Sequence, residues 1–216
     1  MRVLVPAETK AGEKRVALVP DIISKLTRAG LKVVVESGAG VHSQAPDSDY
    51  QSAGAEVFTS QNLNQEFAAA DVVASVQPLS PEIMAKLKRG AITISFLSPS
   101  GATDSINAAA SAGVTAFSME MIPRISRAQS MDALTSQALC AGYRAALVGA
   151  ELSPRFFPLL MTAAGTVTPA QVLVLGAGVA GLQAIATAKR LGAVVSAYDV
   201  RPSSADEVRS MGATFI

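Results

Sequence analysis

Short apolar runs recur through the N-terminal part of the chain, separated by segments in which apolar residues have helical spacing. Each run is rich in β-branched residues and is bounded by polar, glycine or proline residues, which is typical of a buried strand. The sequence therefore predicts five strands. They lie at 2–6, 32–36, 71–76, 91–96 and 113–119.

The segments between these runs carry start and stop signals of helices. In the segment 20–30, Pro20 suits a first helical turn and Gly30 suits the position just after a helix. In the segment 80–90, Ser80 is a predicted N-cap, and Gly90 closes the predicted helix. Strands that alternate with helices predict βαβ units and a largely parallel sheet. We expect an N-terminal α/β domain over residues 1–130.

A long helix is predicted over residues 131–152, with Ser130 as its N-cap and Asp132 in its first turn. It is rich in alanine and glycine, so that another backbone can approach it closely. We expect a connecting helix that packs against both domains. Its predicted apolar face consists of Leu134, Ala138, Ala141, Ala145, Val148 and Leu152.

A glycine motif dominates the C-terminal part. A predicted strand at 172–175 precedes G-x-G-x-x-G, a helix follows to Leu191, and a second strand at 194–198 ends on Asp199. This context is typical of a Rossmann dinucleotide-binding unit. The expected fold is α/β with two doubly wound parallel-sheet domains. The second, over residues 153–216, is expected to be incomplete, because a full domain has two βαβαβ halves.

Each residue of the glycine motif has its own expected role. Gly176 permits a tight turn, Gly178 lets a pyrophosphate approach the helix N-terminus, and Gly181 allows close packing of helix and strand. Asp199 would accept hydrogen bonds from ribose hydroxyls and repel a 2′-phosphate, which favours NAD(H) over NADP(H). Arg201 weakens that preference, since an arginine here can hold a 2′-phosphate. A βα turn without ligand, or a flavin site, remains an alternative.

Composition narrows the classes of function. Among 216 residues, 18 basic and 17 acidic side chains leave a net charge of +1, so we expect no nucleic-acid partner. Cys140 is the single cysteine, and no long apolar segment opens the chain. No run approaches the roughly 20 apolar residues of a membrane-spanning helix. We expect a cytoplasmic protein without a membrane span.

A polar stretch at 123–137, PRISRAQSMDALTSQ, contrasts with the low charge of the rest. It follows a predicted strand end, where loops of parallel sheets bind ligands. On chemistry alone, a solvated loop before a capped helix is the simpler interpretation.

Three longer segments carry a resemblance to a known family: PAETKAGEKRVALVP, the polar stretch itself, and MTAAGTVTPAQVLVLGAGVAGLQAIATAKRLGAVV. They closely resemble the NAD(H)-binding alpha subunit of proton-translocating nicotinamide nucleotide transhydrogenases, and the resemblance spans essentially the whole chain. In that family the RISRAQ loop lies beside the nicotinamide.

The resemblance implies roles for individual residues. Arg124 would hold the nicotinamide half of the cofactor, Gln129 would reach NADP(H) on a partner component, and Asp132 would orient the carboxamide. Thr135 stands where the family commonly has serine, and it completes the implied catalytic set. The other cofactor-binding residues implied by the match are Ile125, Ser126, Gly176, Gly178, Val179, Ala180, Gly181, Asp199, Val200 and Arg201.

The resemblance also implies a mechanism and partners. Hydride would pass directly between NADH on this chain and NADP⁺ on the partner component, coupled to proton flow, without a catalytic acid, base or metal. The implied partners are a second copy of the chain, the NADP(H)-binding component and a membrane proton-channel component. The chain would then be peripheral on the cytoplasmic face of the inner membrane.

Two other functions remain open. Alanine dehydrogenases share RVALVP and VESGAG, and Arg15 matches their substrate arginine. Their lysine and histidine positions hold Ser75 and Ser98 here, which leaves no group to protonate a keto acid. The other alternative is a non-catalytic NAD(H)-binding or assembly module. Because the second domain is expected to be incomplete, we expect the isolated chain to be at best a weak NAD(H) binder without transhydrogenase activity.

Overall fold

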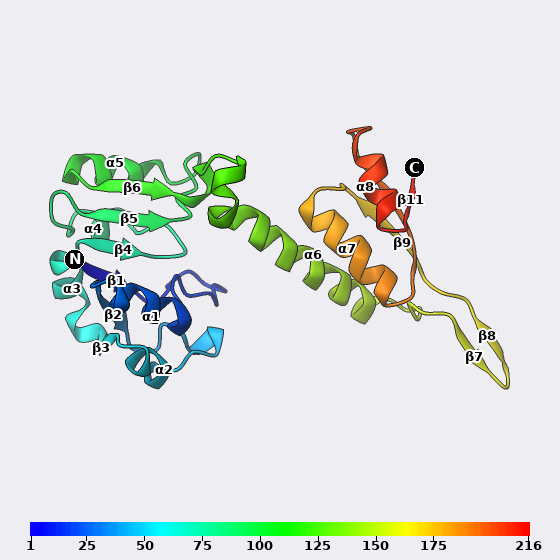
Figure 1. Ribbon diagram of the computed structural model, residues 1–216, viewed down its shortest axis with the longest axis horizontal. Helices are drawn as coiled ribbons and strands as arrows, with labels where there is room; N and C mark the ends of the chain where they lie inside the picture. Colours follow the sequence, from blue (N-terminus) through cyan, green and yellow to red (C-terminus); the bar gives the residue numbers. More distant parts are fainter. The chain divides into compact units, whose positions relative to one another are not determined.

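The computed structural model describes residues 1–216, which form two compact units (Figure 1). The first comprises Met1–Met131 and the second Asp132–Ile216. Both units contain parallel sheets joined by helices, so the predicted α/β class is confirmed. None of the helices combines the length and the apolar character that a bilayer-spanning segment needs.

The first unit contains a six-stranded, fully parallel sheet in the order β3-β2-β1-β4-β5-β6. The chain winds outward from β1 in one direction and then returns to build outward from β4. The position where the order reverses therefore lies between β1 and β4. The strands are β1 (Arg2–Val5), β2 (Lys32–Glu36), β3 (Glu56–Phe58), β4 (Val72–Ala74), β5 (Ile92–Ser95) and β6 (Thr115–Ser118).

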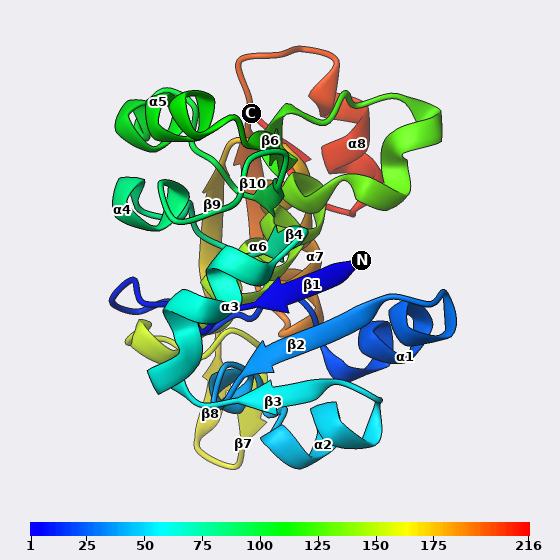
Figure 2. The ribbon, with the colours of Figure 1, turned by 90° about the vertical axis from the view of Figure 1, so that its left-hand side faces the viewer.

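Helices cover both faces of this sheet, with α1 and α2 on one side and α3, α4 and α5 on the other (Figure 2). The α-helices are α1 (Pro20–Arg28), α2 (Asp47–Ser52), α3 (Leu63–Ala69), α4 (Pro81–Met84) and α5 (Thr103–Ala112). Short 3₁₀ turns complete the unit. They are η1 (Val41–Ser43), η2 (Ser60–Asn62), η3 (Met119–Met121) and η4 (Ser126–Met131).

The alternation of side chains along the strands creates two cores in the first unit. Leu4 and Val34 belong to the core beneath α3, α4 and α5. Their neighbours Val3, Val5 and Val33 belong to the core beneath α1 and α2. Because the sheet is buried on both faces, its strands need apolar residues at successive positions, and this explains the continuous apolar runs in the sequence.

The second unit contains a three-stranded parallel sheet in the order β11-β10-β9. Its strands are β9 (Gln171–Leu175), β10 (Val194–Tyr198) and β11 (Thr214–Phe215). The helices α7 (Val179–Arg190) and α8 (Ser204–Ser210) both contribute to one core beneath the sheet. An antiparallel hairpin, β7 (Leu160–Thr162) and β8 (Gly165–Val167), precedes β9.

The long helix α6 (Ala133–Leu152) belongs to the second unit and packs on α7. A Cβ on Gly142 would lie 2.1 Å from the carbonyl oxygen of Ala180, so the helices approach too closely for any side chain there. The predicted apolar face is wrong in part. Gly142 and Ala146 are buried, whereas Ala141, Ala145 and Leu152 are exposed.

The predicted C-terminal end of one helix, the helix that follows Ser80, needs correction. The helix that begins after Ser80 does so as predicted, with the Ser80 hydroxyl accepting a hydrogen bond from Ile83 N. It ends at Met84 rather than near Gly90, and three-residue turns follow, with Leu87 N donating to Met84 O. The turns direct Leu87 into the core, which a continued helix need not do.

Candidate dinucleotide site

The glycine loop joins β9 to α7 in the second unit. Gly176 has a φ of +100°, a conformation that other residues rarely adopt, and its N–H donates to Tyr198 O at 2.8 Å. A Cβ on Gly181 would lie 1.8 Å from Gly176 O. The first and third glycines are therefore required by the backbone itself, whatever the loop binds.

Gly178 differs from the other two glycines. It is the N-cap of α7, where no side chain caps the helix and no acidic residue lies in the first turn. A Cβ built on Gly178 meets no atom within 4 Å, so the fold does not require glycine for packing here. The N-terminus of a twelve-residue helix faces open space, an arrangement that suits a phosphate group.

Asp199 follows β10 and links it to the glycine loop. One carboxylate oxygen accepts a hydrogen bond from Ala177 N at 2.7 Å, and the other accepts from Arg201 N at 2.8 Å. The Arg201 guanidinium adds bonds from Nε at 3.0 Å and from a terminal nitrogen at 3.1 Å. The guanidinium and the two N–H groups hold the Asp199 pKa well below its usual range. The aspartate is thus ionised at neutral pH.

The described residues fit a dinucleotide. The second unit brings together the glycine loop, an uncapped helix N-terminus and a fixed carboxylate at the end of the next strand. The Asp199 carboxylate accepts four hydrogen bonds, two on each oxygen, and movement of the Arg201 guanidinium would free one acceptor position on each oxygen for a hydroxyl donor. Arg201 is exposed, so its side chain can move without disturbing the core.

The RISRAQ segment lies in the first unit and forms η4 after the end of β6. Ala128 is buried and anchors the turn, and its N–H donates to Ile125 O at 2.9 Å. Arg124, Ser126 and Gln129 are all exposed around this anchor. One apolar residue thus fixes a loop whose polar side chains point outward.

Asp132 is the N-cap of α6, where Ser130 was predicted. Its carboxylate accepts from Thr135 N at 2.9 Å and from the Thr135 hydroxyl at 2.7 Å. The predicted N-cap is therefore two residues too early, and Asp132 precedes the first turn of the helix instead of lying in it. A carboxylate satisfies two donors at a helix N-terminus and complements the helix dipole, which a serine does less well.

The fold and the glycine loop define an α/β protein with a Rossmann-type nucleotide-binding half. The chain belongs to the alanine dehydrogenase/PNT family. The model of the N-terminal domain of that family matches residues 4–141, and the model of its C-terminal domain matches residues 145–216.

Individual relatives agree with this assignment. The chain is 48% identical to the first part of NAD(P) transhydrogenase subunit alpha of Rhodospirillum rubrum, over 100% of this chain and 57% of the relative. It superimposes on a transhydrogenase from Sinorhizobium meliloti with a TM-score of 0.94 and 48% identity, over 100% of this chain and 64% of that one. Alanine dehydrogenase of Mycobacterium tuberculosis is 34% identical, over 100% of this chain and 57% of the relative. The chain thus spans less than two thirds of each.

Sequence reasoning missed Ala177 as a residue that shapes the site. Ala177, the residue between the first two glycines, is fully buried and donates its N–H to Asp199. The signal that could have found it is a small residue inside G-x-G. The small residues of α6 predicted that another backbone approaches this helix, and the structure shows that the first turn of α7 does so at Gly142.

Proposed function

We propose that this chain is the NAD(H)-binding component of a proton-translocating transhydrogenase. The observation that carries the proposal is the contact of Asp199 with the glycine loop through Ala177, which fixes a carboxylate that could accept ribose hydroxyls beside a helix end that could bind phosphate. The similarity to transhydrogenase subunits supports the reaction, since members of this family are oxidoreductases.

The residues of the second unit would hold the cofactor. Gly178, Val179 and Ala180 would present backbone N–H groups to the pyrophosphate. Asp199 would accept the adenosine ribose hydroxyls, with Val200 and Arg201 alongside. A bound nicotinamide supplies the hydride, so these residues need only bind and orient it.

The residues of the RISRAQ segment would act at the nicotinamide end. Arg124, Ile125 and Ser126 would contact the cofactor, and Gln129 would extend toward NADP(H) on a separate component. Asp132 and Thr135 form a hydrogen-bonded pair at the start of α6. In that pair, the Asp132 carboxylate would be a fixed acceptor for the nicotinamide carboxamide, and Thr135 would supply a fixed hydroxyl.

A calorimetric titration tests the cofactor assignment. NADH and NADPH are titrated separately into the folded chain and into an Asp199→Asn variant. We expect NADH to bind more tightly than NADPH, and the variant to lose that preference because it no longer repels a 2′-phosphate. Equal affinity for both cofactors in the unmodified chain would contradict the NAD(H) assignment.

A second test separates hydride transfer from binding. With the NADP(H)-binding and membrane components added, Gln129→Asn is expected to slow hydride transfer far more than it weakens NADH binding, because it shortens the side chain by one methylene. Gln137→Asn is the matched control within α6. Equal losses of rate and affinity in Gln129→Asn would assign that residue to cofactor binding alone.

The proposed assembly is a homodimer of this chain with the NADP(H)-binding and membrane components, peripheral on the cytoplasmic face of the membrane. Without those components we expect no transhydrogenation. Activity of the chain with the NADP(H)-binding component alone would contradict a need for the membrane component.

An alanine dehydrogenase activity is the competing function, favoured by the 34% identity to the mycobacterial enzyme. Ser75 opposes it, because its hydroxyl donates to Gln77 O at 2.8 Å and offers no positive charge to a keto acid. NADH oxidation in the presence of pyruvate and ammonia is expected to be absent, and turnover would restore this alternative.

A further inference from the structure

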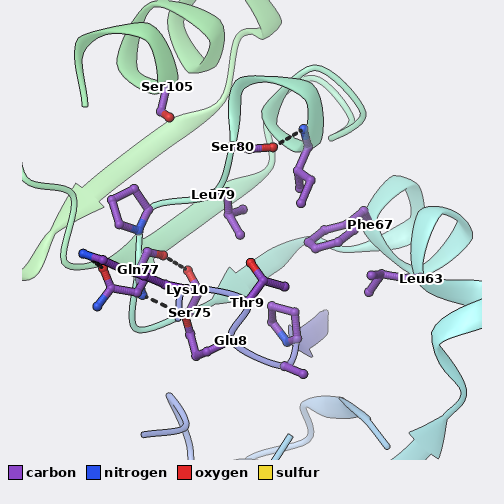
Figure 3. Close-up of a pocket in the computed structure, with 14 residues that line it drawn as sticks. Glu8, Thr9, Lys10, Leu63, Phe67, Ser75, Gln77, Leu79, Ser80 and Ser105 are labelled. Atoms are coloured by element: carbon purple, nitrogen blue, oxygen red, sulfur yellow. Dashed lines mark hydrogen bonds between the residues drawn. The ribbon is translucent and has the colours of Figure 1, made fainter. Parts of the chain in front are cut away.

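A cavity of about 320 Å³ lies wholly within the first unit, separate from the residues assigned to the dinucleotide (Figure 3). Its walls include the segment after β1, from Pro6 to Lys10, and the segment after β4, from Ser75 to Ser80. These segments follow the carboxyl ends of the two strands at which the sheet order reverses. Open parallel sheets bind ligands in the crevice at this position.

The size and lining of the cavity suit a small organic molecule. Ligand pockets begin at about 300 Å³ and are mostly apolar with a few placed polar groups. Here Leu63, Phe67, Leu79 and Ile83 supply an apolar wall from α3, α4 and the segment before α4.

Ser105 adds a hydroxyl group to the cavity wall. It lies in the first turn of α5, and 7% of its surface is exposed. The hydroxyl oxygen points toward the other lining residues (Figure 3). The buried side-chain oxygen that lacks a partner is Thr93 Oγ1, so the Ser105 oxygen stays accessible to a molecule in the cavity.

The charge that is fixed at this cavity is negative. The Glu8 carboxylate is half-buried and accepts the backbone N–H groups of Val76 and Gln77, one on each oxygen. Burial raises the pKa of Glu8. Lys10 is exposed and tethered only by a 3.5 Å hydrogen bond to Gln77 Oε1, so its charge stays at the rim in water.

We propose that this cavity binds a small primary amine, with its ammonium group against the Glu8 carboxylate and its short apolar chain against Phe67 and Leu79. The hydroxyls of Ser105, Thr9 and Ser80 line the same cavity and can accept hydrogen bonds from an ammonium. The site does not depend on the proposed function, because it uses none of the residues assigned to NAD(H).

Three probes of equal chain length test the head group: butylamine, butanol and butyrate. Each is titrated into the isotope-labelled 216-residue chain, and the backbone amide signals of Val76, Gln77 and Ser105 are followed. Butylamine is expected to shift these three signals saturably in the millimolar range, butanol more weakly, and butyrate not at all. Preferential binding of butyrate, or saturable shifts with none of the probes, would overturn the proposal.

Substitutions at Glu8 and at a control glutamate test whether the Glu8 carboxylate holds the ammonium group. Glu8→Gln is expected to weaken butylamine binding about tenfold, while Glu56→Gln, an exposed glutamate on β3, leaves it unchanged. Should Glu8→Gln fail to fold, Lys10→Met decides, because removing a rim cation is expected to tighten butylamine binding at low ionic strength. Weaker binding in Lys10→Met, or equal binding in all variants, would show that Glu8 does not hold the ligand.

Discussion

The two units use the same βαβ element but bury it to different extents. In the first unit both faces of a six-stranded sheet are covered, and Leu4 and Val5 are fully buried. In the second unit α7 and α8 cover one face, and the opposite face leaves Leu173 54% and Leu175 75% exposed. The edge of β9 has no strand partner. The glycine loop of the second unit thus lies on a sheet that helices cover on one face.

This difference indicates where the stability of the chain lies. Apolar burial contributes roughly 25 cal/mol per Å² removed from water, and the second unit forgoes part of it on its open sheet face. Its cohesion depends more on close backbone contacts, notably at Gly142 and Gly181. The predictions below test this contrast.

The largest effect is expected from Gly181→Ala. Its Cβ would meet Gly176 O at 1.8 Å, so the second unit should lose more than about 3 kcal/mol while the first keeps its stability. Hydrogen exchange of β10 amides against β1 amides measures the two units separately. Gly178→Ala is the control, since nothing lies within 4 Å of its Cβ. Equal destabilisation by both would contradict the packing role of Gly181.

A matched pair of leucines tests the covered and open faces directly. Leu4→Ala is expected to cost about 3 kcal/mol, because it leaves a cavity in a fully buried core. Leu175→Ala removes an exposed side chain and should change the free energy of unfolding by less than about 0.5 kcal/mol. Denaturant titrations monitored at each sheet provide the values. A large cost at Leu175 would mean that the open face is covered in solution.

A smaller effect is expected at the start of α6. Asp132→Ala removes the N-cap and should cost about 1 kcal/mol, whereas Ser130→Ala should be neutral. Thermal unfolding of the two variants distinguishes the observed cap from the one that the sequence predicts. A greater loss in Ser130→Ala would reverse the assignment.

The smallest effect concerns acid stability of the first unit. The Arg15 guanidinium donates to both Glu13 oxygens, at 2.8 and 2.7 Å, and lowers the Glu13 pKa from 4.5 to about 2. The stabilisation is therefore full above pH 4.5 and is lost as the pH falls toward 2. It should stay below about 1 kcal/mol, because Arg15 is partly exposed. The difference in unfolding free energy between the unmodified chain and Glu13→Gln should vanish over this pH range. A difference independent of pH would exclude the ion pair as its cause.

The sequence by itself determined the elements whose signals are local. Continuous runs rich in β-branched residues predicted the positions of β1, β2, β4, β5 and β6, because a strand buried on both faces must be apolar throughout. The glycine spacing predicted β9, the loop and α7, because a tight turn and a close helix have few other solutions.

Only the tertiary structure decided the rest. The exposed face of α6 follows from its packing against α7, and the sequence offers small residues on more than one face. The N-cap of α6 is Asp132 and not the predicted Ser130, because the 3₁₀ turn η4 extends through Met131. The cavity beside Glu8 joins segments about 70 residues apart in the chain, as in the Glu8–Gln77 hydrogen bond. No local pattern encodes that proximity, which depends on β1 and β4 lying side by side in the sheet.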